Sequence, residues 1–345
     1  MFRNNFRNLA YTWSLLPGVL VIAGNFIGGN FVYANIIFVF GILCVLEWFV
    51  PENKSNSFHG NSFVPDLILI SHVFLQLIAI SSLFYAIQLN KLSGWQLIGA
   101  AVSTGLHSGT SAIVVAHELI HRKNKLFRTL GKVLLFSAGN TYFYIEHLRV
   151  HHKWVGTDKD PATARKNESL YAFFLRSMFG QISNAYRLEK NRLASVGKHS
   201  LIQNELIRNF IFQLMLFSLI GFFFGIIMVL AFALQILIAN FLLEYTNYIE
   251  HYGLSRNENE RVREDLSWQT DKVISRFLLI DLSRHSDHHY FASKPFHTLQ
   301  SYQGSPILPG GYASAIYLAL IPALWFKVVN NVLEHFIEEK NKKVA

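Results

Sequence analysis

The sequence predicts an all-α integral membrane protein with six transmembrane helices and a histidine-rich cytoplasmic cap. Hydrophobic residues make up 51% of the 345 residues, and 30 of them are phenylalanine, which is too apolar for an ordinary soluble domain. Several uninterrupted apolar runs are long enough to cross a bilayer, and clustered histidines stand at the ends of these runs. We treat the chain as a single domain, residues 1–345, in which membrane hairpins alternate with parts of the cap.

Four apolar runs in the N-terminal third predict two membrane hairpins, residues 11–50 and 64–116. Each run is close to the roughly 20 residues that a helix needs to cross the hydrocarbon core. Arg3 and Arg7 precede the first run, as in a signal peptide, but no small-x-small cleavage site follows, and a second run begins almost at once. A membrane hairpin is therefore the better interpretation. The runs cover residues 11–28, 31–50, 64–89 and 95–116.

Charge predicts the orientation. The turns near Gly29 and Ser93 hold only Lys91, whereas the segment after residue 116 is strongly basic. The positive-inside rule therefore places the N terminus and the first histidine cluster in the cytoplasm, in a multi-pass protein of the inner (plasma) membrane. The formal net charge of +9 follows from these flanking residues, so no nucleic-acid partner is expected. The basic residues after the fourth run are Arg122, Lys123, Lys125, Arg128 and Lys132.

The remaining apolar segments are assigned by length and parity. Residues 210–243 carry no charge over 34 positions, and all histidine clusters share one side only if this region crosses twice. We expect a third hairpin, residues 207–249, that turns near Gly221 and Gly225. The apolar stretch 133–145 is too short to cross and is expected at the membrane surface or inside the cap. Residues 312–326, interrupted by Pro322, are expected to form a helix under the cap, although a seventh span stays open. The cap comprises residues 117–206 and 250–345.

Nine histidines form four clusters next to the apolar runs. In HELIH, His117 and His121 are four residues apart and share one face of a helix. The motif EHLRVHH repeats this arrangement with His147, His151 and the additional His152. His251 closes the sixth apolar run in NYIEHYG, and the motif RHSDHH contributes three more histidines, which are His285, His288 and His289.

These clusters predict a metal site with two ions. Neutral imidazoles bind iron, copper, zinc and nickel, and nine of them exceed what one ion coordinates. The single cysteine, Cys44, lies in an apolar run, so a disulfide, a structural zinc site with thiolates and an iron–sulfur cluster are not expected. HELIH also resembles the HExxH of zinc proteases, with Glu118 as the base, but that site would leave most of the histidines unexplained. Carboxylates beside the histidines are expected to orient the imidazoles; these are Glu118, Glu146, Glu250 and Asp287.

The four motifs, in this order and with six apolar runs, resemble the membrane-bound alkane monooxygenase (alkane 1-monooxygenase) family of the integral-membrane fatty acid desaturase and hydroxylase superfamily. NYIEHYG separates this family from acyl-chain desaturases, and the stretches DKDPATAR and LPGGY are also similar to it. Ile120, Arg122 and the segment YFASKPFHTLQ depart from the pattern of many alkane-oxidising members. These departures leave the substrate open, because relatives oxidise alkanes, methyl groups of aromatic rings and other lipidic chains.

The resemblance implies a non-haem di-iron centre that uses O2 to hydroxylate the terminal carbon of an alkane, or an alkyl or methyl group of an apolar substrate. It also implies that all nine histidines bind the two iron ions, and that the four neighbouring carboxylates support them. Two other functions stay open. A lipid desaturase would give an alkene instead of an alcohol, and a metal-binding protein or transporter would consume no O2.

The reaction needs electrons from another protein, since the chain has no dinucleotide-binding fingerprint and no four-cysteine iron site. In the family the donor is rubredoxin or ferredoxin with its reductase, and these donors are commonly acidic. Basic residues beside the motifs could attract such a donor, or could simply set the topology and contact anionic membrane lipid. The candidates are Arg122, Lys123, Lys125, Arg128, Lys153, Arg165, Lys166, Arg187, Lys190 and Arg192.

Several other histidines are expected to play no part in metal binding. His107 lies ten residues before His117, about 15 Å deeper along a helix, so it cannot bind the same ion. We expect His107 and His72 to be buried packing or hydrogen-bonding groups, or else residues of a substrate tunnel. The remaining histidines lie in polar segments, and only His297 is near enough to the last cluster to support it. The others are His59, His199 and His335.

Overall fold

The computed structural model describes residues 8–55, 62–198 and 200–344 and is all-helical apart from two isolated β-bridges in this described part. Arg3, Arg7, His59 and His199 lie outside the described residues. Within them, six helical stretches are long and apolar enough to cross a membrane, so the predicted fold class is confirmed. These spans are Leu9–Ile27, Gly29–Phe49, Phe63–Gln88, Trp95–His121, Glu205–Phe224 and Ile226–His251.

The first, second and fourth spans are built from several helical segments. The first joins a 3-10 helix, η1 (Leu9–Leu15), to α2 (Leu16–Ile27). The second and fourth each contain a π-helix, η3 (Ile37–Leu43) and η4 (Ser108–Ile113) respectively. A π-turn inside a long helix is often associated with a functional site. The other segments of these two spans are η2 (Gly29–Tyr33), α3 (Ala34–Ile36), α4 (Cys44–Phe49), α6 (Trp95–His107) and α7 (Val114–His121).

The third, fifth and sixth spans are the single helices α5 (Phe63–Gln88), α12 (Glu205–Phe224) and α13 (Ile226–His251). Gly225 separates α12 from α13 and has a φ of +84°, a conformation that glycine adopts without strain. Two candidate spans therefore lie where the third hairpin was predicted, and the chain turns between them at Gly225. Gly221 lies inside α12 and takes no part in the turn.

The fourth and sixth spans pack closely through two glycines on the fourth span, Gly105 and Gly109. A β-carbon at Gly105 would lie 2.8 Å from the carbonyl oxygen of Gln235, and one at Gly109 would lie 2.7 Å from Cδ1 of Leu242. Glycines four residues apart allow two membrane helices to approach backbone to backbone. This contact holds α6 and η4 against α13, and both spans end in histidine-bearing segments, α7 and the last turn of α13.

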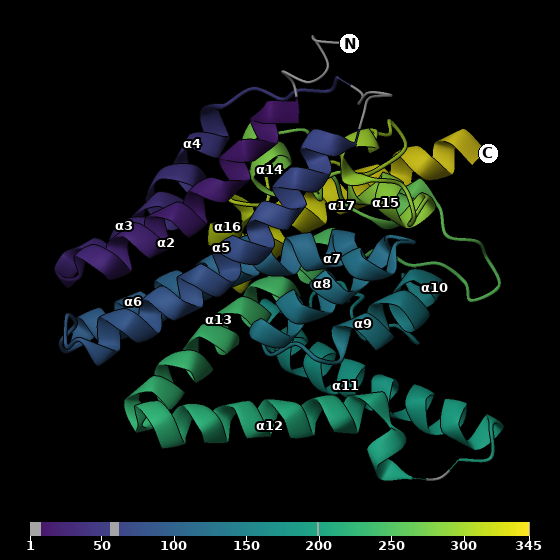
Figure 1. Cartoon of the computed structure of the whole chain (residues 1–345). Helices are drawn as coiled ribbons and strands as arrows, with labels where there is room; N and C mark the ends of the chain where they lie inside the picture. Colours follow the sequence, from purple (N-terminus) through teal and green to yellow (C-terminus); the bar gives the residue numbers. More distant parts are fainter. Residues whose placement is uncertain (1–7, 56–61, 199, 345) are drawn as a thin grey trace.

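The cap is formed by the segments between and after the spans (Figure 1). Helix α8 (Lys125–Ser137) packs on α7 and buries Leu134 and Leu135, so the short apolar stretch 133–145 belongs to the cap. The long helix α11 (Leu170–Ser195) packs against α12 and α13. The short helices α9 (Phe143–Glu146), η5 (His147–His151), α10 (His152–Trp154), α14 (Val273–Leu278) and α15 (His285–Tyr290) complete this end of the molecule.

The prediction of one helix over residues 312–326 is wrong. Two helices occupy this region, α16 (Ala315–Ala319) and α17 (Pro322–Val344). Pro322 is the first residue of α17, where its missing N–H and fixed φ are tolerated, whereas inside a helix it would break the hydrogen-bond ladder. Helix α17 is not among the six candidate spans, and its apolar face is buried in the core. The side chains on this face are Trp325, Val329 and Leu333.

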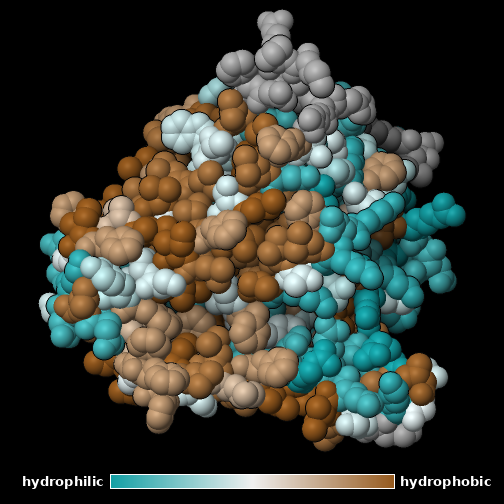
Figure 2. Space-filling view, in the orientation of Figure 1, coloured by the Kyte–Doolittle hydropathy of each residue, from teal (hydrophilic) through white to brown (hydrophobic). Residues whose placement is uncertain are grey.

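Figure 2 shows apolar residues across the middle of the visible face, over the spans. Hydrophilic residues gather at the end where Figure 1 places α10 and α15. The four histidine motifs meet at this end, because the fourth and sixth spans both end here, in His121 and His251. Two candidate spans, α12 and α13, separate the second histidine motif from the third. This even number agrees with the parity argument that predicted two spans in this region.

Candidate metal centre

The nine predicted histidines converge into two adjoining groups. Five form the first group, in which one nitrogen from each ring lies within 4.8 Å of the others. Their Nε2 atoms face one another directly, at 2.8 Å between His117 and His288 and at 3.0 Å between His147 and His152. The first group comprises His117, His121, His147, His152 and His288.

The second group contains four buried histidines within the same spacing. The Nε2 atoms of His285 and His289 lie 2.9 Å apart, and the buried Nε2 atoms of His151 and His251 have no hydrogen-bond partner in the described ranges. The two groups adjoin, since the rings of His152 and His289 have centroids 4.6 Å apart. The second group comprises His151, His251, His285 and His289.

The sequence motifs are divided between the groups, which the helical spacing did not predict. His147 and His151, expected on one face, belong to different groups, and His147 is instead grouped with His152. The π-helix η5 explains this difference, because its wider turn aligns residues five apart instead of four. In α15 the ordinary i, i+4 relation holds for His285 and His289, while His288 points to the first group.

This arrangement fits two metal ions. A neutral imidazole has a single N–H, so five Nε2 atoms that face one another cannot all be satisfied by mutual hydrogen bonds. Burial, followed by the neighbouring imidazoles, lowers the pKa of His147, His152 and His288 well below the usual value. The same causes lower the pKa of His285 and His289. Neutral rings with converging lone pairs are the form in which histidine binds iron, copper or zinc.

Two hydrogen-bonding groups that do not belong to the second group orient imidazole rings of that group. Asp160 lies with Oδ2 at 2.9 Å from Nδ1 of His151, and the carbonyl oxygen of Leu266 lies 3.0 Å from Nδ1 of His251. Each contact fixes the tautomer that leaves Nε2 directed into the group. Burial alone would raise the pKa of Asp160, but His151 and the hydroxyl of Thr163 hold it below the usual value.

Asp160 was not predicted as a site residue. It lies in the stretch DKDPATAR, which the sequence linked to the family without a role for any of its members. The available signal was one of two aspartates in this stretch, nine positions after His151, and this spacing matches no helical or strand period. Only the turn after α10 brings the carboxylate back to the imidazole.

The four predicted carboxylates have different surroundings. Glu250 contacts the centre, with Oε2 at 3.2 Å from Nε2 of His285. Glu118 accepts a hydrogen bond from Arg122 Nε at 2.7 Å, and Asp287 accepts hydrogen bonds from Lys294, the Gln300 backbone and Tyr302. Glu146 is buried, and one of its oxygens has no partner among the described residues. Burial and then the charges of Asp160 and Glu244 raise its pKa well above the usual value.

Replacing Asp160 with asparagine tests its positioning role. The amide keeps the size but removes the charge that holds the tautomer of His151, so metal affinity is expected to fall about tenfold. Titration of the purified protein with ferrous iron, followed by optical or Mössbauer spectroscopy, measures this change. Asp158→Asn, at an exposed position two residues earlier, is the matched control. Equal iron affinity and equal spectra in both variants would contradict the role of Asp160.

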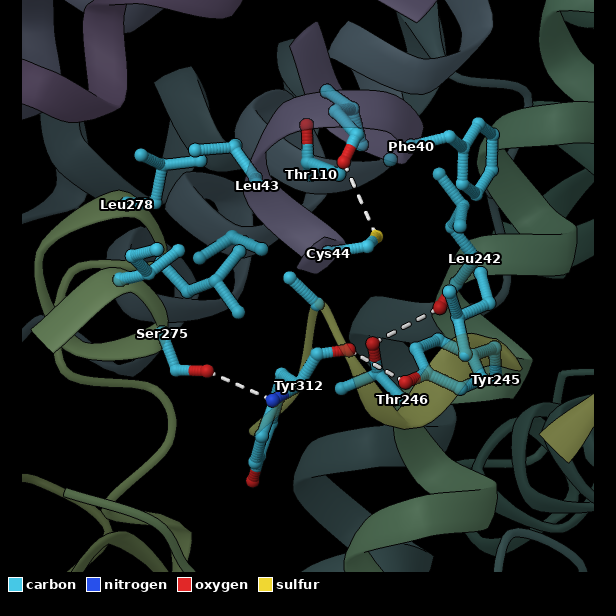
Figure 3. A pocket seen from close by; sticks show the side chains of 17 residues that line it. Phe40, Leu43, Cys44, Thr110, Leu242, Tyr245, Thr246, Ser275, Leu278 and Tyr312 are labelled. Carbon is cyan, nitrogen blue, oxygen red and sulfur yellow. Dashed lines mark hydrogen bonds between the residues drawn. The ribbon is translucent and has the colours of Figure 1, made fainter. Parts of the chain in front are cut away.

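An apolar cavity of about 60 Å³ lies between the second, fourth and sixth spans, α14 and the segment around Tyr312 (Figure 3). Its wall includes residues of the two π-helical regions and of α13. Gly109, Val114 and Thr246 also line a smaller cavity of about 20 Å³. That smaller cavity is lined in addition by three candidate ligands, His117, His147 and His285. The two cavities therefore share part of their walls, and the smaller one is lined by candidate metal ligands.

The hydroxyl groups around the larger cavity already donate hydrogen bonds to backbone carbonyl groups of the protein. Thr110 donates to the carbonyl of Leu106 at 2.8 Å, and Thr246 donates to the carbonyl of Leu242 at 2.9 Å. Figure 3 also shows the hydroxyl of Tyr245 on the carbonyl of Tyr312, at 2.5 Å. The wall thus presents methyl groups and aromatic carbon, and a polar substrate group would find few free partners there.

Glu47, which was not predicted as a site residue, connects the cavity to the centre. This buried carboxylate at the end of the second span accepts hydrogen bonds from the backbone N–H groups of Ser275 and Ser314 at 3.0 and 2.8 Å. The loop that leads to Ser314 carries Tyr312, whose hydroxyl donates to Glu250 at 3.0 Å. Glu47 therefore holds a loop that lines the cavity and contacts a carboxylate of the centre.

The histidines expected outside the centre are indeed separate from it. His72 lies between the hydroxyls of Ser14 and Ser111, and His107 is fully buried without a hydrogen-bond partner in the described part of the chain. His335 is 75% exposed on α17. His297 is buried, which lowers its pKa to about 4, but it belongs to neither group.

Comparisons with known proteins agree with this class of site, a histidine-rich metal centre at one end of a membrane helix bundle. Residues 93–319 match the family described as fatty acid desaturase. Alkane 1-monooxygenase 2 of Alcanivorax borkumensis is 37% identical over 89% of this chain and 83% of its own length. Alkane 1-monooxygenase of Acinetobacter baylyi is 31% identical over 96% and 87%.

The xylene/toluene monooxygenase hydroxylase component XylM of Pseudomonas putida is more distant, 25% identical over 91% of this chain and 86% of its own length. The fold and the site define a multi-pass membrane oxidoreductase of the desaturase superfamily. Within it, the chain belongs to the alkane 1-monooxygenase family.

Proposed function

We propose that this protein hydroxylates the terminal carbon of an alkane, or an alkyl or methyl group of another apolar substrate, at a non-haem di-iron centre. The observation that carries the proposal is the apolar cavity that shares Gly109, Val114 and Thr246 with a smaller cavity lined by the histidines. Its hydroxyl groups are satisfied by the protein itself, which favours a hydrocarbon over a molecule with a polar head group in this space.

We propose that the nine histidines hold two iron ions, five around one ion and four around the other. Bound iron would supply the reduction of O2 that C–H oxidation requires. The balanced reaction takes one hydrocarbon, one O2, two electrons and two protons, and it gives one alcohol and one water. The apolar wall orients the chain end and excludes bulk water, while Asp160 holds the imidazole of His151 in place through Nδ1.

Two further parts of the function are proposed on the same basis. The electrons come from a separate protein, rubredoxin or ferredoxin with its reductase, because the chain has one cysteine and no dinucleotide fingerprint. The centre faces the cytoplasm from the inner (plasma) membrane, because the segment around the first motif is the most basic flank of the spans.

Product analysis tests the proposal. Cells that express the chain with a rubredoxin system are given a mixture of n-alkanes, alkylbenzenes and fatty acids, and the extracts are separated by gas chromatography. Terminal or benzylic alcohols are the expected products, and the substrate consumed fastest defines the class. Unsaturated products alone would instead support a lipid desaturase on the same scaffold. Zinc in the purified protein with no oxidised product would contradict the proposal.

A further inference from the structure

Glu250 approaches His285 from the side on which this imidazole faces the other histidines of its group. Oε2 of Glu250 lies 3.2 Å from Nε2 of His285, and the same Nε2 lies 2.9 Å from Nε2 of His289. A carboxylate that orients a metal-bound imidazole contacts the nitrogen that does not bind the ion, as Asp160 does at Nδ1 of His151. Orientation of the ring therefore does not explain the position of Glu250.

The spacing between Glu250 and His285 is that of two ligands of one ion. Donor atoms that each lie about 2.1 Å from a metal ion, at ordinary bond angles, are about 3.0 to 3.4 Å apart. The 3.2 Å between Oε2 and Nε2 lies within this interval. Glu250 also lines the smaller cavity together with His117, His147 and His285. The carboxylate thus borders a space that both histidine groups border.

The charge of Glu250 has no other partner. Its side chain is buried, and its carboxylate forms no ion pair with lysine or arginine in the described ranges. Glu118 and Asp287 each pair with a nearby basic side chain, so the other carboxylates of the motifs differ from it. Glu146 is buried as well, but it contacts no histidine nitrogen in the described part of the chain. Burying a carboxylate without a cation is costly, and a metal ion supplies the missing positive charge.

Tyr312 fixes the second oxygen of the Glu250 carboxylate. Its hydroxyl donates to Oε1 at 3.0 Å, which leaves Oε2 on the side of the histidines. The backbone of Tyr312 is held at two points, because its N–H donates to Ser275 Oγ at 2.8 Å and its carbonyl accepts from Tyr245 at 2.5 Å (Figure 3). The carboxylate is therefore oriented by hydrogen bonds that do not involve the histidines, as metal-binding carboxylates usually are.

We propose that Glu250 is a tenth metal ligand, which binds the second ion beside His285 through Oε2. This inference rests on the proposed di-iron centre. Four imidazoles leave room for a further ligand, and non-haem iron sites commonly combine histidines with a carboxylate. Glu250 lies at the edge of the second group, since the four nitrogens within 4.8 Å of one another define that group without it. The two ions then differ, with five neutral rings around the first and four rings and one negative charge around the second.

Replacing Glu250 with glutamine tests this ligand. The full chain in nanodiscs is loaded with ⁵⁷Fe(II) without oxygen, and Mössbauer spectra and ferrous titrations are recorded. The parent is expected to give two quadrupole doublets of equal area. The amide oxygen of Glu250→Gln is neutral and a weaker donor, so one doublet is expected to change while the other stays. The affinity for one of the two ions is expected to fall at least about tenfold.

Two further variants separate metal binding from packing. Tyr312→Phe removes only the hydrogen bond to Oε1, so both doublets should persist and the affinity should fall less than in Glu250→Gln. Glu244→Gln makes the same chemical change six residues earlier on α13, at a buried carboxylate that accepts from Gln181 and Asn247. Its doublets and its iron affinity should match those of the parent.

Infrared spectra of the parent give a measurement that needs no variant. With ¹³C-labelled glutamate, the spectrum with iron minus the spectrum without metal is expected to contain a shifted glutamate carboxylate band. Unchanged doublets and affinity in Glu250→Gln, an equal change in Glu244→Gln, or the absence of that band would each overturn the proposal. Fewer than two irons in the parent would contradict the di-iron centre itself. Two irons with the expected spectra but no alcohol would count against the proposed function alone.

Discussion

Replacing His147 or His288 with alanine is expected to remove iron and abolish hydroxylation. Each ring contributes an Nε2 atom to the first group, and the buried cavity left by alanine offers no replacement ligand. Changes to residues that merely orient ligands cost about 10- to 100-fold in metal affinity or activity, so loss of a ligand should cost at least about 100-fold. Iron per chain by mass spectrometry and alcohol formation by gas chromatography measure the effect.

His335→Ala is the control for these two variants. His335 is an exposed histidine on α17, paired only with Glu339 on the same helix, so its removal should change neither iron nor product. Full iron occupancy in His147→Ala or His288→Ala would contradict the assignment of the first group.

Filling the passage at Val114 is expected to stop oxidation while the metal centre stays intact. Val114 lines the apolar cavity, the smaller cavity lined by His117, and a third cavity lined by His117 and His288, and it is not a candidate ligand. A phenylalanine there would occupy space of the order of the passage itself, so kcat/KM for hydrocarbons should fall at least about tenfold, a cost of about 1.4 kcal/mol in transition-state binding. Product formation over a series of chain lengths measures the change, with iron content determined in parallel.

The control for Val114→Phe is Val114→Ile, which adds one methylene and should shift the chain-length preference without abolishing product. Because overpacking can destabilise a core, thermal unfolding of both variants is compared with the parent. A Val114→Phe protein with normal iron and normal rates on all substrates would show that hydrocarbons reach the centre by another route.

The sequence predicted the parts of this structure that depend on local pattern. Long apolar runs gave the six spans, parity gave the third hairpin, and the histidines next to the runs all belong to the centre. Predictions from local pattern were wrong where a break in regular helical geometry changed which residues face one another or where a helix begins. The π-turn at η5 separates His147 from His151, and Pro322 starts a new helix where a continuous one was expected.

Partners that come from distant parts of the chain could not be predicted either. Asp160 reaches His151 by a turn without periodicity, and Glu47 reaches a loop more than 220 residues away. Both are single acidic residues, and neither lies inside a histidine motif. Their roles depend on tertiary packing, which also determines that the hydroxyls of Thr110 and Thr246 turn toward their own helices and leave the cavity apolar.

The origin of the oxygen atom in the product tests the central claim most directly. The purified protein, supplied with iron, an electron donor and a hydrocarbon that it consumes, is incubated under ¹⁸O2, and the product is analysed by mass spectrometry. A di-iron monooxygenase gives an alcohol that carries one ¹⁸O atom from O2. An alcohol whose oxygen comes from water, or an alkene without any labelled alcohol, would contradict the proposed reaction.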